Sequence, residues 1–237
     1  MTSHTGDTFA PLPGAPLECL VAANVHGLYC VPAASRHRPA ARRILAGDVW
    51  EPDTIAWIIA HRRSGDVVHA GTYFGDFLPA LARSLADGAR VWAFEPNPEN
   101  HACARLTIAL NGLTGVVLHH AALGAAAGRV ALVTHDEQGV SLGGASHVDA
   151  ARDAGPDGVA VVRLDDTIPA DRPVDVVQLD VEGSEEEALA GALGLIGRWR
   201  PALLLERPPE AWLERVLAPL GYAPAGKVHA NTAWLPG

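Results

Sequence analysis

The feature that most constrains the fold is a pair of buried strands, the first followed by a glycine turn and the second ending in an acid. The first strand, residues 66–71, ends at Gly71, and a helix begins just beyond, at about Gly75. The second strand, residues 90–95, ends at Glu95. Glycine lets the backbone approach a ligand closely, and a carboxylate at the next strand end can accept hydrogen bonds from a ribose diol. The pattern therefore predicts an α/β nucleotide-type site at the carboxyl ends of parallel strands.

The turn between Gly71 and Gly75 narrows the choice of ligand. A dinucleotide-binding turn reads G-x-G-x-x-G, so that a pyrophosphate can lie against a helix N-terminus. Here the bulky side chains of Tyr73 and Phe74 stand where the phosphates would lie, and the sequence has no G-x-x-x-x-G-K-[ST] loop. A nucleoside without phosphates fits better, and S-adenosylmethionine is the cofactor that we expect.

Apolar segments with strand character alternate with amphipathic segments along most of the chain. Strands are expected at residues 66–71, 90–95, 116–119, 129–134, 159–164, 174–180 and 202–206. Helices are expected at residues 52–62, 76–86, 98–110, 184–196 and 211–220. This alternation predicts an α/β fold with a doubly wound, mostly parallel sheet.

The domain organisation follows from composition and spacing. Residues 1–17 are expected to form a flexible tail, and residues 18–237 a single domain. Within that domain we expect an N-terminal β-hairpin and connector (18–49), a core (50–206) and a C-terminal helix followed by strands (207–237). The glycine-containing segment from His135 to Pro156 lacks periodicity, and we expect it to be a loop that covers the substrate side of the site.

Charge and cysteine content exclude several classes of partner. The net charge is −9 and Lys227 is the only lysine, so no basic stripe is present to bind nucleic acid or an anionic membrane surface. No run of 18 apolar residues and no signal pattern is found, and a cytoplasmic location is expected. The three cysteines have no metal-binding spacing and are expected to be reduced packing residues.

Five short motifs, in order along the chain, resemble one known family. They are Trp50-Glu51-Pro52, Val68 to Gly75, Phe94-Glu95-Pro96-Asn97-Pro98, His120 to Gly124, and Leu179-Asp180-Val181-Glu182-Gly183-Ser184-Glu185. Together they resemble the FkbM-type methyltransferases, S-adenosylmethionine-dependent enzymes that mostly methylate hydroxyl oxygens. The last motif is the most specific of the five. The resemblance implies a Rossmann-like class I methyltransferase fold for the core.

Two positions depart from the family pattern. The family usually has Asp where this chain has His69, and Lys where it has Gln178. The family's Asp helps to brace the glycine turn around the methionine end of the cofactor. His69 can replace it as a hydrogen-bond partner but not as a fixed negative charge.

The expected cofactor site combines the two strand ends with the residues after the third strand. Glu95 is the ribose ligand, and Asn97 either contacts the adenosine or caps the helix that starts at Pro98. Asp76 either lines the methionine part or is a first-turn acid favoured by the helix dipole. The resemblance adds His120 and Ala121 beside the adenine. The full set is His69, Gly71, Tyr73, Gly75, Asp76, Glu95, Pro96, Asn97, Asn100, His120, Ala121 and Asp180.

The reactive end is expected at the acids that follow the last parallel strands. Asp180 and Glu182 come two residues apart after a buried strand, and Glu206 ends the next strand, where it either faces the same cleft or pairs with Arg207. With His229 in the tail, these four are the candidate catalytic residues. The carboxylates are compatible with Mg²⁺, but the sequence predicts no metal. Ser184 and Glu187 are expected to form a capping box at the start of the next helix.

The sequence thus predicts an S-adenosylmethionine-dependent O-methyltransferase that acts on a hydroxyl of a small polar molecule, such as a sugar moiety or a secondary-metabolite intermediate. The alternatives are a nicotinamide-dependent oxidoreductase, which uses a similar turn and acid, and a non-catalytic relative that binds the cofactor. The expected partner is the hydroxylated small molecule. The hairpin is compatible with a homo-oligomer.

Overall fold

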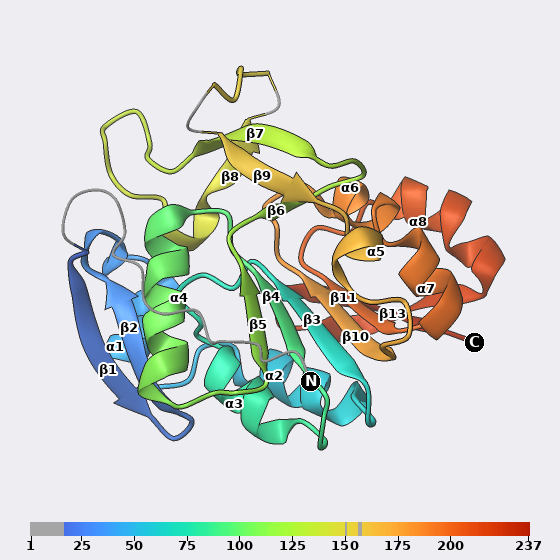
Figure 1. Cartoon of the computed structure of the whole chain (residues 1–237), viewed down its shortest axis with the longest axis horizontal. Coiled ribbons are helices and arrows are strands. Elements are labelled where there is room, and N and C mark those ends of the chain that lie inside the picture. The colour runs from blue at the N-terminus through green and yellow to red at the C-terminus, as the bar shows by residue number, and fades with distance from the viewer. Residues whose placement is uncertain (1–16, 150, 156–157) are drawn as a thin grey trace, which may run out of the picture.

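The computed structural model describes residues 17–149, 151–155 and 158–237, and its centre is a seven-stranded sheet (Figure 1). The strand order is β12-β13-β11-β10-β3-β4-β5. Their bounds are β3 (Asp66–Ala70), β4 (Val91–Phe94), β5 (Val116–His119), β10 (Val174–Leu179), β11 (Ala202–Leu205), β12 (Tyr222–Val228) and β13 (Asn231–Pro236). The five strands from β11 to β5 are parallel, and β13 is antiparallel to both of its neighbours. The predicted doubly wound, mostly parallel sheet is confirmed.

The central strands form because most of their residues are apolar and are buried on both faces of the sheet. Every residue of β3 and β10 is buried, as expected for parallel strands covered by helices. Neighbouring residues of β3 enter different cores: Val68 packs with Leu189 and Ile196, whereas Val67 packs with Ile58 and Leu81.

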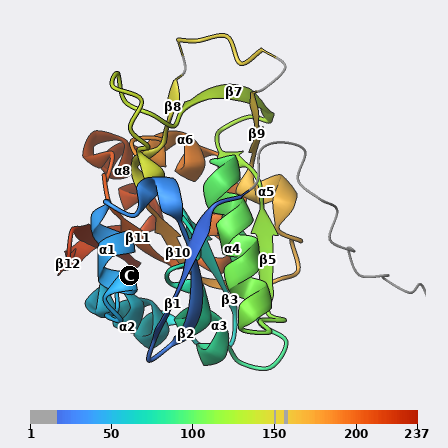
Figure 2. The same cartoon turned by 90° about the vertical axis from the view of Figure 1, so that its left-hand side faces the viewer.

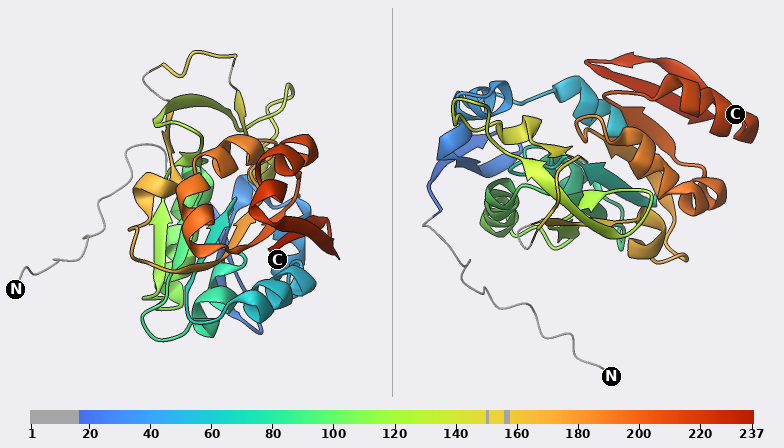
Figure 3. Two further views of the ribbon diagram at one scale, coloured as in Figure 1. Left: turned by 90° about the vertical axis from the view of Figure 1, so that its right-hand side faces the viewer. Right: turned by 90° about the horizontal axis from the view of Figure 1, so that it is seen from above.

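Helices cover both faces of the sheet. Their bounds are α1 (Pro39–Leu45), α2 (Pro52–His61), α3 (Leu78–Ser84), α4 (Pro98–Leu110), α5 (Leu164–Thr167), α6 (Glu185–Ala190), α7 (Leu193–Trp199) and α8 (Glu210–Val216), with short 3-10 turns η1 (Ala33–Ser35), η2 (Gly143–Ala145) and η3 (Ala218–Leu220). The orange and red helices α6 to α8 lie on the side facing the viewer in Figure 3, left. Among the described residues, no helix is both long enough and apolar enough to cross a bilayer.

The predicted N-terminal hairpin is confirmed as β1 (Cys19–Asn24) and β2 (Gly27–Pro32), which pair antiparallel. It lies beside α4 (Figure 2). Tyr29 and Val31 form a third core with Ile44, Phe74 and Cys103. The three cysteines are free thiols, as expected. The expected tail falls outside the described residues except for Leu17.

A second, smaller sheet lies across the carboxyl ends of the main one, at the top of Figure 1. It consists of β6 (Ala122–Leu123), β7 (Gly128–Val133), β8 (His147–Asp149) and β9 (Val159–Val162), in the order β6-β9-β7-β8. The strands expected near residues 129–134 and 159–164 belong to this sheet and not to the main one.

The expectation of an irregular loop from residue 135 is wrong for its first part. This part contains a bridge between His135 and Ser141, then η2 and β8. The side chains of Asn97 and Asn100 supply hydrogen-bond partners for it, as described below. Residue 150 and Pro156, at the far end of the predicted loop, lie outside the described residues.

The helix expected over residues 184–196 is two helices, α6 and α7. A Cβ on Gly191 would lie 2.1 Å from the carbonyl oxygen of Gly124, and the Gly191 carbonyl accepts the N–H of Asp165. Because the segments around Gly124 and Asp165 pack closely against Gly191, the Gly191 carbonyl bonds Asp165 and not a later N–H group of a continuous helix. The predicted capping box is also wrong, since the side chain of Ser184 makes no capping hydrogen bond.

Candidate active site

The candidate site lies where the strand order reverses, between β3 and β10. The chain runs from β3 outward through β4 and β5, then returns to build β10 and β11 on the other side, and ligands of such sheets bind at this switch point. Gly71 follows β3 with φ +84°, and a Cβ there would lie 1.8 Å from the carbonyl oxygen of Asp180. Only glycine allows the two strand ends to meet so closely.

Two cavities flank this contact, and Gly71, Gly144 and Asp180 line both of them. The first, here called the apolar cavity, contains about 460 Å³ of space between protein atoms, part of which is open to solvent. Its walls are mainly apolar groups from the main sheet, the small sheet and the connections between them: Phe94, Pro96, Ala121, Leu123, Leu132 and Val148. Glu95 also lines it, so an apolar ring and a polar diol can be accommodated together.

Glu95 is held in a fixed orientation by backbone groups. It is 4% exposed, its Oε2 accepts the N–H of Tyr73 at 2.7 Å, and its Oε1 accepts the N–H of Asn97 at 2.8 Å. Burial raises the pKa of Glu95 to about 7, and these hydrogen bonds oppose the rise. Oε2 accepts a single hydrogen bond within the described residues, and a carboxylate oxygen can accept two, so acceptor capacity remains for a ligand.

Asn97 and Asn100 hold the site together and do not line either cavity. Asn97 caps α4 by accepting the N–H groups of Glu99 and Asn100, which is the structural alternative foreseen for it. Its amide donates to Ser146 Oγ at 2.9 Å, and the Asn100 amide donates to the Gly143 carbonyl at 3.0 Å. These hydrogen bonds hold residues 143–146 next to the residues that follow β4.

The histidine after β5 is also outside the cavities. His120 is exposed, its Nε2 lies 3.0 Å from the Pro96 carbonyl oxygen, and its ring stacks on His101 at 4.7 Å. The neighbouring Ala121 and Pro96 do line the apolar cavity.

The second cavity, here called the acidic cavity, contains about 640 Å³ of space between protein atoms, part of which is open to solvent. Five carboxylates line it: Glu51, Asp76, Asp180, Glu182 and Glu206. Arg38, Trp50 and Tyr73 complete its polar and aromatic lining. Both alternatives foreseen for Glu206 are found together, since it lines this cavity with Asp180 and its Oε2 lies 3.5 Å from Arg207 Nε.

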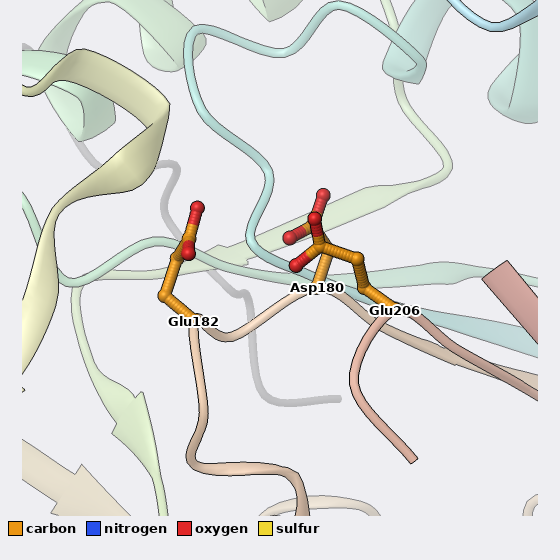
Figure 4. A group of neighbouring side chains, drawn as sticks. All are labelled: Asp180, Glu182 and Glu206. Carbon is orange, nitrogen blue, oxygen red and sulfur yellow. The ribbon is translucent and has the colours of Figure 1, made fainter. Parts of the chain in front are cut away.

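Three of these acids form a cluster at the ends of β10 and β11. Oxygen atoms of Asp180, Glu182 and Glu206 all lie within 4.8 Å of one another, and Figure 4 shows the side chains turned toward a common space. Burial, and next the nearby Glu206, raise the pKa of Asp180 well above its usual range. Burial also raises the pKa of Glu182, opposed by Arg207, whose Nη2 lies 2.5 Å from Glu182 Oε2. Such a cluster can take up a proton or hold a cation.

Backbone strain is concentrated around the acidic cavity. Five of the described residues other than glycine have a positive φ. Three of these five line the acidic cavity: Glu51 at 43°, Tyr73 at 52° and Glu182 at 54°. A fourth, His229 at 52°, contacts Glu51. Each such residue costs on the order of 1–3 kcal/mol, and strain of this kind clusters at functional sites.

His229 contacts residues that line the acidic cavity but does not line it itself. Its Nδ1 lies 3.2 Å from Glu51 Oε1 and its ring packs edge-on against Trp50, but it does not line either cavity. The structure thus places this candidate catalytic residue as a partner of Glu51. Glu51 also accepts hydrogen bonds from Thr54 and Asn231.

The two departures from the family pattern contact each other. His69 and Gln178 are opposite one another on β3 and β10, and His69 Nδ1 lies 2.5 Å from Gln178 Oε1. His69 is 2% exposed, and burial lowers its pKa to about 4, so the ring is neutral near neutral pH. It stacks on Phe77 and lines neither cavity, while its carbonyl accepts the Thr72 hydroxyl in the glycine turn.

Gly75 likewise lines neither cavity, and its role is to allow the positive φ that the turn requires. It has φ +84°, and a Cβ there would lie 3.1 Å from a methyl group of Leu78 and 3.3 Å from one of Thr107. Of the predicted site residues, the structure brings to the cavities Gly71, Tyr73, Asp76, Glu95, Pro96, Ala121, Asp180, Glu182 and Glu206.

Sequence reasoning missed part of the lining. The residues concerned are Arg38, Trp50, Glu51, Gly144, Ser146, His147 and Ser184. Trp50, Glu51 and Ser184 belong to the first and the last of the five motifs, and this was the available signal. The others reach the cavities from connections whose path has no periodic pattern.

Comparison of the sequence and the structure with known proteins identifies the family of this chain. The family described as the methyltransferase FkbM domain matches residues 69–216. The methyltransferase FkbM from Methylobacillus flagellatus KT has a similar solved structure, with 21% sequence identity and a TM-score of 0.51. The alignment covers 73% of this chain but 43% of that protein, so the present chain spans less than half of its length.

Two further solved structures align over most of their length. One is a SAM-dependent methyltransferase from Aquifex aeolicus, with 13% sequence identity and a TM-score of 0.42; the alignment covers 84% of this chain and 92% of that one. The other is a methyltransferase from Geobacter sulfurreducens, with 14% sequence identity and a TM-score of 0.45; the alignment covers 85% of this chain and 86% of that one. A search of curated proteins finds no match. The fold is the Rossmann-like class I methyltransferase fold. Since the family match spans more than half of the chain, the protein belongs to the FkbM methyltransferase family.

Proposed function

We propose that the protein is an S-adenosylmethionine-dependent O-methyltransferase that acts on a hydroxyl of a small polar molecule, such as a sugar moiety or a secondary-metabolite intermediate. The observation that carries the proposal is the position of Asp180, on the wall shared by the apolar and the acidic cavity. A group there can meet a cofactor on one side and an acceptor on the other.

The residues present fit S-adenosylmethionine. The apolar cavity offers flat, uncharged walls for an adenine, and the remaining acceptor capacity of Glu95 suits a ribose diol. Gly71 lines both cavities without a side chain, and Asp76 and Glu51 in the acidic cavity suit the ammonium group of the methionine part. When bound, the cofactor supplies a methyl group activated by a positively charged sulfur.

The chain's own task is to orient the acceptor and remove its proton. The chain would hold the acceptor hydroxyl so that its oxygen could receive the methyl group from the cofactor's sulfur, and a carboxylate would take up the hydroxyl proton. Asp180 is the candidate base, because burial and then the nearby Glu206 raise its pKa and so favour the form that holds the proton. Positioning can supply roughly 7–11 kcal/mol, and such proton transfer about 10²–10⁴-fold in rate.

We favour methyl transfer over nicotinamide chemistry because of the turn. A pyrophosphate would need free N–H groups at a helix N-terminus. The Tyr73 N–H instead donates to Glu95, and its ring fills the space beyond the turn, where its hydroxyl lies 2.6 Å from Ser35 Oγ.

Titration calorimetry with S-adenosylhomocysteine and with NAD tests the proposal. We expect the first to bind and the second not to bind. Glu95→Gln keeps the size of the side chain but removes its charge and one acceptor, so S-adenosylhomocysteine affinity should fall at least about tenfold, which is ~1.4 kcal/mol. Glu186→Gln, an exposed acid on α6, is the matched control. Binding of NAD alone, or equal affinity of the Glu95→Gln variant, would overturn the assignment.

A further inference from the structure

A third cavity lies beside the other two, between the small sheet and the start of α6. It contains about 1040 Å³ of space between protein atoms, part of which is open to solvent. It shares Ala122, Leu123, Val148 and Ser184 with the apolar cavity. It also shares Glu182 with the acidic cavity. This third cavity, here called the sheet groove, is therefore continuous with the candidate site.

One face of the small sheet forms the apolar wall of the sheet groove. The strand register pairs Leu132 with Val148, and Val130 with Val159. Because side chains alternate along a strand, these four residues project from one face, as does Val161, two positions after Val159. Leu132 and Val148 line the apolar cavity, whereas Val130, Val148 and Val161 line the sheet groove. A single aliphatic surface thus extends from one cavity to the next, across the top of Figure 1.

The side chains of this aliphatic surface are only partly covered by the protein. Val130, Val148 and Val161 are half-buried, whereas every residue of β3 and β10 in the main sheet is buried. The connection between β6 and β7 adds small residues to the lining: Gly124, Ala125 and Ala126. An apolar ligand in the groove would remove the exposed valine surface from water, which is favourable.

The cofactor of the proposed function, on which this inference rests, does not account for the sheet groove. S-adenosylmethionine has one apolar ring system, its adenine. The candidate ribose ligand, Glu95, lines the apolar cavity and not the groove, so the adenine is assigned to the apolar cavity. The groove instead meets the acidic cavity at Glu182, next to the candidate base Asp180.

We propose that the acceptor is amphipathic, with its hydroxylated part in the acidic cavity and an apolar chain or ring in the sheet groove. The apolar portion extends past Glu182 and contacts Val130, Val148 and Val161. A second polar portion fits this wall less well, because valine side chains offer no hydrogen bond. Arg129, the basic residue in the lining, donates its guanidinium to the carbonyl of Gly158.

Binding of two diols to the protein loaded with S-adenosylhomocysteine tests the inference. Propane-1,2-diol and octane-1,2-diol have the same pair of hydroxyls and differ in the length of the apolar chain. Because S-adenosylhomocysteine takes up the apolar cavity in this complex, the chain needs another apolar wall. In titration calorimetry we expect the longer diol to bind at least about tenfold more tightly than the shorter one.

A double variant distinguishes the sheet groove from other apolar surfaces. Val130→Thr with Val161→Thr keeps the shape of both side chains and their fit to a strand, but places hydroxyls on the wall. It should abolish most of the preference for the longer diol. Val133→Thr is the matched control and should preserve the preference. Val133 lies on β7 with Val130, projects from the opposite face and lines none of the three cavities.

Three results would overturn the inference. They are equal affinity of the two diols, no measurable binding of octane-1,2-diol, and a preference for the longer diol that survives in the double variant. A native dimer that dissociates in the double variant, measured by sedimentation velocity, would also overturn it, because a second copy of the chain would then cover the valines. Failure of S-adenosylhomocysteine to bind is a different result, because it removes the proposed function itself.

Discussion

Asp180 shows how one side chain can join two parts of the site. It follows the buried strand β10, its backbone contacts Gly71, and its carboxylate belongs to the cluster with Glu182 and Glu206. Its raised pKa reflects burial and a neighbouring acid. These are the conditions under which a carboxylate accepts a proton near neutral pH.

Replacing Asp180 by Asn tests this role. The amide has nearly the same shape but cannot take the acceptor proton, so turnover should fall by about 10²–10⁴-fold. S-adenosylhomocysteine affinity should stay close to that of the native protein. The melting temperature at neutral pH should rise, because burial and Glu206 disfavour the charged carboxylate in the folded protein and an amide does not bear that cost. Assays of methyl transfer and thermal unfolding check both expectations. Unchanged turnover would exclude Asp180 as the base.

His69 and Gln178 form the second residue-scale test. Each departs from the family pattern, and the structure shows that the two departures form one hydrogen-bonded pair. A neutral pair thus occupies the place of an expected charged pair. His69→Asp or Gln178→Lys alone would bury an unpaired charge, whereas the double variant restores a pair.

Urea unfolding of the two single variants and the double variant measures this coupling. The double variant should be more stable than the sum of the single losses predicts, by roughly 1–3 kcal/mol. Simple additivity of the two losses would show that the residues are independent.

At the residue scale, the sequence located the groups that directly follow strands. Gly71, Glu95, Asp180, Glu182 and Glu206 could be found because strand ends are local signals. Trp50 and Glu51 belong to a recognisable motif. No sequence pattern predicts, however, that Glu51 has a left-handed backbone conformation before α2 or that its side chain lines a cavity. His120 and His229 were placed too close to the chemistry, because sequence position does not give side-chain direction.

At the scale of elements, the segment between β7 and β8 depends on two amides from the start of α4. The Asn100 side chain donates to the carbonyl of Gly143 and, at 3.4 Å, to Glu95. Backbone periodicity carries no trace of such long-range contacts. The same limitation explains the split between α6 and α7, which depends on the contact of Gly191 with Gly124.

Asn100→Ala should therefore loosen the segment over the site. Removing a buried hydrogen-bond donor costs about 1–3 kcal/mol, and amide hydrogen exchange at residues 142–146 should become faster. Asn111→Ala is the matched control, because Asn111, at the other end of α4, bonds both backbone groups of Leu28 in the hairpin. Its effect should appear in the hairpin and near the end of α4, where Asn111 also bonds Thr107 and Arg83, and not at residues 142–146. Equal exchange at residues 142–146 in both variants would contradict this account.

At the scale of the whole molecule, the buried acids make stability depend on pH. Burial raises the pKa of Asp76 from 3.8 to about 8. Between these values the unfolded chain has lost the proton and the folded chain retains it, so stability should fall as pH rises. Glu95, with a pKa of about 7, acts in the same direction. His69 and His101, whose pKa values are lowered to about 4, act oppositely, but only below about pH 6.5.

From about pH 6.5 to 8 the histidines no longer contribute, Asp76 and Glu95 both do, and comparison with Asp76→Asn separates the effect of Asp76. In the protein without ligand, the free energy of unfolding should fall more steeply for the native chain than for Asp76→Asn. The difference should be roughly 1 kcal/mol per pH unit. Urea unfolding at several pH values measures both slopes. Parallel slopes would show that Asp76 is ionised in the folded protein across this range.

A crystal structure with S-adenosylhomocysteine tests the central claim most directly. We predict density for the ribose hydroxyls within hydrogen-bond distance of the Glu95 carboxylate, the adenine in the apolar cavity and the sulfur facing Asp180. Density for the ligand at another place, or a ribose that does not contact Glu95, would contradict the account.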